Sequence, residues 1–263
     1  MNSRALLSYF SALVRHNLRA GLAQPGIAAT SALLMFGNNL IFFLVWVIYF
    51  ANFSNLRGWG LKDLALLIGI CAWAFGLTVV FVGGVRHMAH SIVDGELDVH
   101  LGRPRHPLLS LLMSRSLPSG FGDLASAFVF WIWLADRGLD ELPFLLLVAT
   151  AAAVVLAATA ALIQCLVFWL PGAVLLCEEV FNMFLMVGFY PQHPFGFTVR
   201  LVLFTVFPTA FVTLLPVEAV READPLKALA VLGAAVFYAG LAVTVFNRGL
   251  RRYASGNRLL ELR

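Results

Sequence analysis

Long apolar runs recur throughout this 263-residue chain, and they restrict its fold more than any other feature. Several hold 18 or more residues, which is long enough for an α-helix to cross a hydrocarbon core of about 30 Å. The chain is 61% hydrophobic, and its mean hydropathy is +0.88. A soluble domain is therefore excluded, and the sequence predicts an all-α, polytopic membrane protein.

Six of the runs are predicted to cross the membrane. The predicted spans are 27–52, 61–83, 117–135, 143–169, 173–189 and 226–246. Ahead of them, residues 3–20 predict an amphipathic helix, because Arg4, Arg15 and Arg19 recur at helical spacing opposite a leucine-rich face. Such a helix lies in the headgroup layer of the membrane, and the alternative is a fully soluble leading helix.

One further apolar run, 199–215, is interrupted by proline. The prolines before, within and at the end of this run are Pro191, Pro194, Pro208 and Pro216. Because proline removes a helical hydrogen bond, each half of the run is too short to cross a membrane. Residues 190–225 are therefore predicted to form a pair of short re-entrant helices on the extracytoplasmic side.

The placement of positive residues decides between six spans and seven. With six spans, twelve of them share one side: Arg4, Arg15, Arg19, Arg86, Arg103, Arg105, Arg115, Arg248, Arg251, Arg252, Arg258 and Arg263. The other side carries Arg57, Lys62, Arg137, Arg200, Arg221 and Lys227. A seventh span would move the arginine-rich tail to the outer side, against the positive-inside rule. Six spans with both termini cytoplasmic are therefore predicted.

Residues 95–108, GELDVHLGRPRHPL, form a polar island in this apolar chain and must face water. The opening glycine frees the backbone to leave the preceding helix, and Pro104 and Pro107 fix the direction of the chain. Glu96 and Asp98 can accept hydrogen bonds from arginines on a partner. The island therefore predicts a docking surface, and the alternative is a solvated, charged turn.

Several kinds of chemistry are excluded or disfavoured. A phosphate-binding P-loop needs a lysine after glycine, whereas Lys62 and Lys227 both follow leucine. An intramembrane hydrolase is disfavoured because no G-x-S-x-G motif occurs. His87, His90 and Asp94 share a helical face that could hold zinc, but the next residue is a helix-breaking glycine. A polar contact surface is the preferred interpretation of these three residues.

Ionisable residues at membrane depth are Asp123, Glu178 and Glu179. Their burial is costly, so they are candidates for a gate or a proton relay. The preferred interpretation places all three near the cytoplasmic ends of their helices, where water or Arg115 reaches them and where the glutamates pair with charges. Four amides are predicted to form hydrogen bonds between helices: Asn38, Asn39, Gln164 and Asn182.

The island also carries a family resemblance. Gly95-Glu96-Leu97-Asp98, followed by Leu101, Arg103-Pro104 and Pro107-Leu108, resembles the signature of six-helix permeases of the type-2 ABC exporter superfamily. Two weaker segments fit the same family, namely Tyr190-Pro191 with Arg200, Pro208 and Pro216, and the tail Gly249-Leu250-Arg251-Arg252-Tyr253. The matches extend from the second span to the end of the chain.

The resemblance implies a single permease domain over 1–263, in a bacterial cytoplasmic membrane. A cytoplasmic loop at 85–116 would dock on a separate ATPase subunit through Gly95, Glu96, Leu97, Asp98, Arg103, Pro104 and Pro107. The re-entrant pair would include Tyr190, Pro191, Arg200, Pro208 and Pro216. ATP and magnesium would be held by the partner, and this chain would bind no cofactor and have no enzymatic activity. A second permease subunit, identical or a sister chain, would complete the pathway.

Two other functions remain open at this level. One is an ion- or proton-coupled secondary carrier that uses Asp123, Glu178 and Glu179, although the internal repeats typical of such carriers are weak here. The other is a structural membrane scaffold. The net charge of +4 is modest, so membrane lipid is an expected partner and nucleic acid is not. Because the spans hold few fixed polar groups, an amphipathic or lipid-like cargo suits them better than a small ion.

Overall fold

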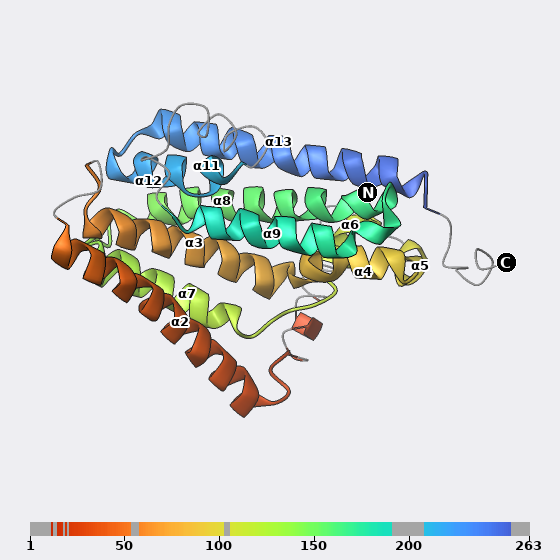
Figure 1. Ribbon diagram of the computed structural model, residues 1–263, viewed down its shortest axis with the longest axis horizontal. Helices are drawn as coiled ribbons and strands as arrows, with labels where there is room; N and C mark the ends of the chain where they lie inside the picture. Colours follow the sequence, from red (N-terminus) through yellow and green to blue (C-terminus); the bar gives the residue numbers. More distant parts are fainter. Residues whose placement is uncertain are drawn as a thin grey trace.

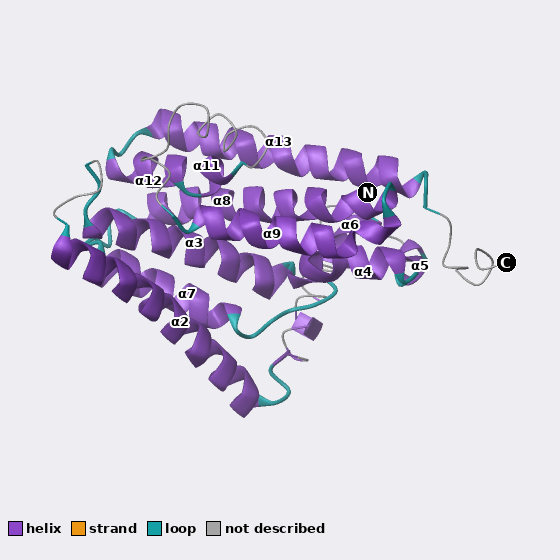
Figure 2. Cartoon of the chain, viewed as in Figure 1, coloured by secondary structure: helices purple, strands orange, loops and turns teal. Residues whose placement is uncertain are grey.

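The computed structural model is a bundle of helices (Figures 1 and 2). It describes residues 12, 15–17, 19, 21–53, 58–102, 106–190 and 208–253, and no strand occurs in these parts of the chain. The all-α prediction is therefore confirmed. Most of the predicted interfacial helix 3–20 and of the predicted outer segment before Pro208 lies outside the described residues.

The helices follow one another along the described parts of the chain. In order they are α2 (Pro25–Asn52), α3 (Leu61–Phe81), η1 (Gly83–His87), α4 (Met88–Val93), α5 (Leu97–Leu101), α6 (Pro107–Leu112), α7 (Gly120–Val129), η2 (Phe130–Leu134), α8 (Leu142–Gln164), η3 (Cys165–Phe168), η4 (Pro171–Ala173), α9 (Val174–Gly188), α11 (Thr209–Val212), α12 (Leu214–Arg221) and α13 (Pro225–Leu250).

Five helices in the described residues are long and apolar enough to cross a membrane. They are Pro25–Asn52, Leu61–Phe81, Leu142–Phe168, Pro171–Gly188 and Pro225–Leu250. They establish a multi-pass membrane protein.

The span predicted at 117–135 is shorter in the structure. Its helical part, Gly120–Leu134, has ten residues in α7 and five in the π-helical turn η2. At 1.5 Å per residue it reaches only about 22 Å. Leu117, the first residue of the predicted span, lies before α7 begins. Its backbone N–H donates to the Val79 carbonyl, so this residue packs on α3.

Local sequence explains where two of the long helices start. Asp224 caps α13, because its carboxylate accepts the backbone N–H groups of Leu226 and Lys227. At the start of α3, Asp63 accepts the N–H of Gly60 at 2.8 Å, which satisfies a donor ahead of the first turn.

The centre of the bundle is α3, which packs on α7 and α8, while α13 packs on α8 and α2 packs on α7. α3 is the most enclosed of the five long helices and α2 the least. Figure 1 shows α2 running obliquely, with its amino-terminal end far from the other helices. Only Ala28, Asn39 and Phe43 of α2 are buried.

Glycine allows α2 to approach α7 closely. A Cβ placed on Gly122 would lie 1.9 Å from the backbone carbonyl oxygen of Ala32 in α2. Small residues at such crossings let two helix backbones come into contact in a membrane. The α2–α7 contact therefore depends on the missing side chain at this position.

The region before α13 contains α11, of four residues, and α12, of eight. Pro216 directly follows the apolar run 199–215, but it does not end a helix. Pro216 is the third residue of α12, where the helix does not yet need its N–H, and the helix continues to Arg221. Pro208 directly precedes α11. Tyr190 follows α9 and lies edge-on to Phe42 of α2, with ring centroids 6.1 Å apart.

Candidate functional site

The polar island belongs to a helical lobe at one end of the bundle (Figure 1). The lobe consists of η1 and α4, which precede the island, α5 within it, and α6, which begins at its end. The lobe lies at the same end as the carboxyl end of α13, and α12 and the start of α3 lie at the opposite end. The lobe is thus more ordered than the loop that the sequence predicted at 85–116, since α4, α5 and α6 are helices.

Two glycines shape the lobe. Gly95 has a φ of +83° and turns the chain between α4 and α5, as its position in the motif predicts. Gly84 lies against α6, where a Cβ would come within 2.1 Å of the Leu111 carbonyl oxygen. The backbones of η1 and α6 are therefore in direct contact, and this contact joins the first and last helices of the lobe.

The inner face of α5 is packed against the rest of the molecule. Leu97 is fully buried, and the buried His100 ring shares a hydrogen bond with the Ser110 hydroxyl at 2.9 Å. Asp98 lies beside Tyr253, just beyond the end of α13. Burial first, and then the neighbouring Asp98 carboxylate, raise the pKa of Tyr253 to about 12. These contacts join α5 to α6 and to the end of α13.

The outer face of α5 is free of such packing. Val99 is 64% exposed and Leu101 is 42% exposed. Glu96 is also exposed, and its carboxylate accepts a hydrogen bond from the Ser91 hydroxyl at 2.7 Å, which ties α5 to α4. The exposed Asp94 lies in the turn before Gly95. The exposed side chains of this part of the lobe therefore include two apolar ones, Val99 and Leu101, and two acidic ones, Asp94 and Glu96.

The predicted coupling residues thus fall into separate groups. Glu96 lies on the accessible surface, Leu97 and Asp98 face inward, and Pro107 is the first residue of α6. Arg103 and Pro104 lie outside the described residues. Sequence reasoning missed Val99, although an apolar residue inside so polar a stretch was a signal for it.

Two polar contacts connect the lobe to the long helices. The backbone N–H of Ala89 in α4 donates to the side-chain oxygen of Gln164 at the end of α8, over 3.3 Å. His90 and Glu178 of α9 form an ion pair when the imidazole is protonated, with Nδ1 and Oε1 3.5 Å apart. Glu179, the neighbouring residue, is exposed.

His87 lies in a positively charged surrounding at the base of the lobe. Burial, followed by the charges of Arg115, Arg86 and His90, lowers the pKa of His87, and Glu178 opposes this shift in part. His87 is therefore held neutral. In the described part of the chain, no three His, Cys, Asp or Glu side chains gather as a metal site.

Asp123 lies away from the lobe, inside the bundle. It is 1% exposed, and its carboxylate accepts a hydrogen bond from the Asn39 amide of α2 at 2.8 Å. The same amide donates to Ser126, at 2.9 Å. The predicted contacts of Asp123 with water or Arg115 are replaced by this buried cluster.

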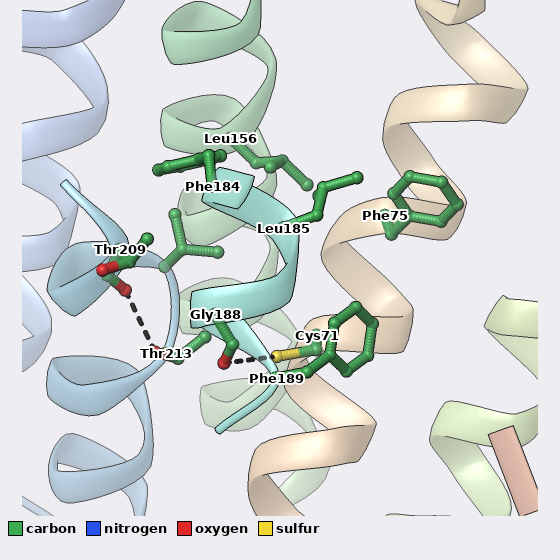
Figure 3. A pocket seen from close by; sticks show the side chains of 10 residues that line it. Cys71, Phe75, Leu156, Phe184, Leu185, Gly188, Phe189, Thr209 and Thr213 are labelled. Carbon is green, nitrogen blue, oxygen red and sulfur yellow. Dashed lines mark hydrogen bonds between the residues drawn. The ribbon is translucent and has the colours of Figure 1, made fainter. Parts of the chain in front are cut away.

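A small pocket lies between α3, α8, α9 and α11 (Figure 3). Its polar atoms already have partners, since Cys71 donates to the Gly188 carbonyl and Thr213 to the Thr209 carbonyl. Its free volume of about 20 Å³ is enough for about one water molecule. The pocket is therefore too small to hold a transported molecule.

The chain belongs to the ABC-2 family of transporter proteins, whose model matches residues 36–256. The match covers the lobe and every helix from α3 to α13. No curated protein and no solved structure matches the chain. The protein is therefore a permease of an ABC transporter, a membrane subunit for transport that is not itself catalytic, and permeases of this family normally pair with an ATPase subunit.

Proposed function

We propose that this chain is the permease subunit of an ATP-driven exporter and that its helical lobe docks on a separate ATPase subunit. The ATPase binds ATP and magnesium, and this chain supplies half of the pathway, completed by a second permease subunit that is identical or a sister chain. The observation that carries the proposal is the exposed apolar pair Val99 and Leu101 on a lobe braced against three long helices.

The surface of α5 has the composition of a docking site. Val99 and Leu101 lie beyond the end of α3, on a lobe made largely of a polar stretch of sequence. Exposed apolar side chains rimmed by polar residues are typical of protein contacts. The exposed Asp94 and Glu96 precede these two residues in the chain, so the complementary surface we propose is apolar with arginine or lysine at its edge.

The contacts between the lobe and the long helices suit the lobe to transmit motion. Ala89 is bonded to α8, His90 lies beside Glu178 of α9, and Asp98 lies beside Tyr253 at the end of α13. A displacement of α5 by the ATPase would therefore act on three long helices together. Rigid-body movement of packed helices is a common means of switching access.

We place the lobe in the cytoplasm and count Gly120–Leu134 as the sixth span. At the opposite end of the bundle, cations lie beside acids: Lys62 contacts Asp136 at 2.7 Å, and Lys227 contacts Glu218 at 3.0 Å. The exposed Arg248 lies in the last turn of α13, and the exposed Arg251 and Arg252 directly follow the helix at the lobe end. This distribution supports cytoplasmic termini in a bacterial inner membrane.

The amino-terminal helix has support from one contact. The residues described there, 12, 15–17 and 19, are helical, and the Asn17 amide donates to the Met113 carbonyl just after α6. This contact supports a position of the proposed interfacial helix at the level of the lobe. The re-entrant pair remains part of the proposal, supported by the shortness of α11 and α12.

A secondary carrier is less well supported. Its carboxylates would have to line a shared path. Asp123 is enclosed between α2 and α7, whereas Glu178 lies beside the lobe and Glu179 is exposed.

The test is recovery of an ATPase subunit with the tagged permease. A P-loop ATPase subunit from the same genome is co-expressed with the tagged permease, and the complex is purified in detergent. Val99→Asp combined with Leu101→Asp should reduce recovery at least tenfold, because two charges would enter an apolar contact. Leu139→Asp is the matched control, since Leu139 is 73% exposed and lies in the connection between α7 and α8, away from the lobe. Equal recovery with the double variant and the control would refute docking through α5.

A further inference from the structure

One long helix of the bundle, α2, turns most of its surface outward. It lies at the edge of the bundle, where it packs on α7 and α3 (Figure 1). Only three of its 28 residues are buried, and many of its large apolar side chains are exposed. Lipid covers exposed apolar side chains in a membrane, so an exposed polar side chain on this face says more about what packs there.

The amide of Asn38 is such a group. Within the described part of the chain its side chain makes no hydrogen bond. By contrast, Thr30, Ser31 and Asn52 donate to carbonyls of their own helix, and Asn39 donates into α7. Asn38 is exposed, so its amide is free to bind a group outside this chain.

Asn38 also lies at the middle of the span. At 1.5 Å per residue, Asn38 is about 20 Å from either end of α2. Half of the hydrocarbon core measures about 15 Å, so the headgroup layers are out of reach of this side chain. An amide without a partner in hydrocarbon is costly, and polar residues at this depth almost always pair with other polar groups. The amide therefore indicates a protein partner at the centre of the membrane.

The side chains around Asn38 form a heptad seam. Six exposed residues of α2 follow one another at alternating intervals of four and three: Leu34, Asn38, Ile41, Val45, Ile48 and Asn52. This spacing is the a/d repeat of a two-helix coiled coil, with Asn38 in an a position. A single asparagine in an a position of a coiled coil fixes the register of the two helices.

The seam faces away from the rest of the molecule. Successive residues of a helix are about 100° apart around its axis, so Leu34 and Val45 lie within about 40° of Asn38. Asn39 and Phe43, which are buried, lie about 100° and 140° away. The seam and the face that packs on α7 are therefore separate surfaces, and both can be occupied at once.

A second copy of this chain is the partner that fits the seam. Two copies cross the membrane in the same direction, so their α2 helices are parallel and hold Asn38 at the same depth. A two-fold axis places the same surface of each copy against the other. An asparagine amide is both a donor and an acceptor, so two of them satisfy one another across the axis.

We propose that the second permease subunit is another copy of this chain, and that α2 packs on α2 of the partner along this seam with the two Asn38 amides bonded to each other. The inference rests on the proposed function for the need of a second permease subunit, which that function leaves as an identical or a sister chain. It adds the identity of the partner and the surface that holds it.

The test is disulfide cross-linking of the full-length chain in native membranes with a membrane-permeable oxidant. Leu34→Cys and Ile41→Cys, both in the seam, should form linked dimers, and the buried native cysteines give little background. Leu33→Cys is the matched control, because Leu33 and Leu34 are both 70% exposed but point about 100° apart. Leu34→Cys should give at least ten times more dimer than Leu33→Cys. Equal yields, or no dimer from either seam variant, would overturn the proposal.

Two differently tagged copies, expressed together, identify the partner. The linked product of Leu34→Cys should carry both tags, whereas a product that joins this chain to a different protein would contradict the proposal. Cross-linking of the ATPase from Val99, measured in the same cells, separates the two proposals. ATPase contact without a dimer through α2 would refute this inference alone, and a dimer through α2 without ATPase contact would refute docking through α5 alone.

Variants of Asn38 test the amide pair. Asn38→Leu should weaken dimerisation in lipid vesicles at least tenfold, measured by energy transfer between labelled copies, and Asn38→Gln should restore most of it. Unfolding of the monomer in detergent should not change, because the amide has no partner within the described chain. Full dimerisation of Asn38→Leu would overturn the amide pair. Reaction of Asn38→Cys with a water-soluble thiol reagent would show that this position faces water, and would also contradict the proposal.

Discussion

The side-chain amide of Asn39 donates a hydrogen bond to the Asp123 carboxylate across 2.8 Å and so joins α2 to α7. Both residues are almost fully buried. Since Asn39 is one of only three buried residues on α2, this bond is a principal attachment of the least enclosed span. Phe43, four residues later, adds an edge-on contact with Phe130, with ring centroids 5.4 Å apart.

Replacing Asn39 should destabilise the bundle. Asn39→Ala removes the partner of the Asp123 carboxylate and one of the two partners of the Ser126 hydroxyl, which still donates to the Asp123 backbone carbonyl. The buried carboxylate left without this bond should lower the free energy of unfolding by about 1–3 kcal/mol. Asn38→Ala is the matched control, because Asn38 is exposed on the same helix. Denaturant unfolding of the purified protein in detergent measures the difference. Equal losses for the two variants would show that the buried bond contributes nothing.

Glycine at position 122 should be required for the contact between α2 and α7. In Gly122→Ala, the new Cβ would meet the Ala32 carbonyl oxygen at 1.9 Å, so α2 must shift away. Overpacking of this kind should cost about 1–3 kcal/mol. Gly37→Ala, on α2 with nothing within 4 Å, should instead gain up to about 1 kcal/mol from helix propensity. A stability of Gly122→Ala equal to that of Gly37→Ala would contradict the close contact.

Local composition predicts the long spans well. The expected runs 61–83, 173–189 and 226–246 correspond to Leu61–Phe81, Val174–Gly188 and Pro225–Leu250. Apolar length is a property of the segment itself, and capping residues such as Asp224 act over a few positions. The bounds of these helices could therefore be predicted from the sequence to within a few residues.

Contacts between distant segments were not predictable in the same way. Asp98 was expected to point at a partner, but it lies beside Tyr253, more than 150 positions later in the chain. The choice of Asn39 as the partner of Asp123 likewise depends on how α2 crosses α7. The exposure of Val99 follows from the burial of Leu97 and His100 on the opposite face of α5. Periodicity alone does not set this orientation in a helix of five residues.

The lobe should lose stability in mild acid because of His87. Burial and the charges of Arg115, Arg86 and His90 lower its pKa in the folded protein. The unfolded chain then binds a proton below about pH 6.5 that the folded protein binds only at lower pH. The contribution of His87 to the free energy of unfolding is therefore fully present above about pH 6.5 and is lost as the pH falls toward the lowered pKa of the folded protein. Thermal unfolding between pH 7.5 and pH 5 should be less pH-dependent in His87→Gln, and an unchanged slope would remove His87 as the cause.

Thiol labelling tests the proposed orientation. The three native cysteines are buried and give little background. Leu139→Cys, in an exposed position at the end opposite the lobe, should react with a membrane-impermeant reagent in intact cells. Gly102→Cys, exposed at the end of α5, should react only after permeabilisation. Labelling of Gly102→Cys in intact cells would place the lobe outside and overturn the cytoplasmic assignment.

Photo-cross-linking from α5 in living cells tests the central claim most directly, because it records what touches the lobe without purification. A photoreactive phenylalanine analogue replaces Val99 in one strain and Leu139 in another, as both are exposed but lie in separate parts of the molecule. The account predicts that Val99 cross-links to an ATPase subunit with a P-loop and that Leu139 does not. Cross-linking of that ATPase from Leu139, with none from Val99, would contradict it.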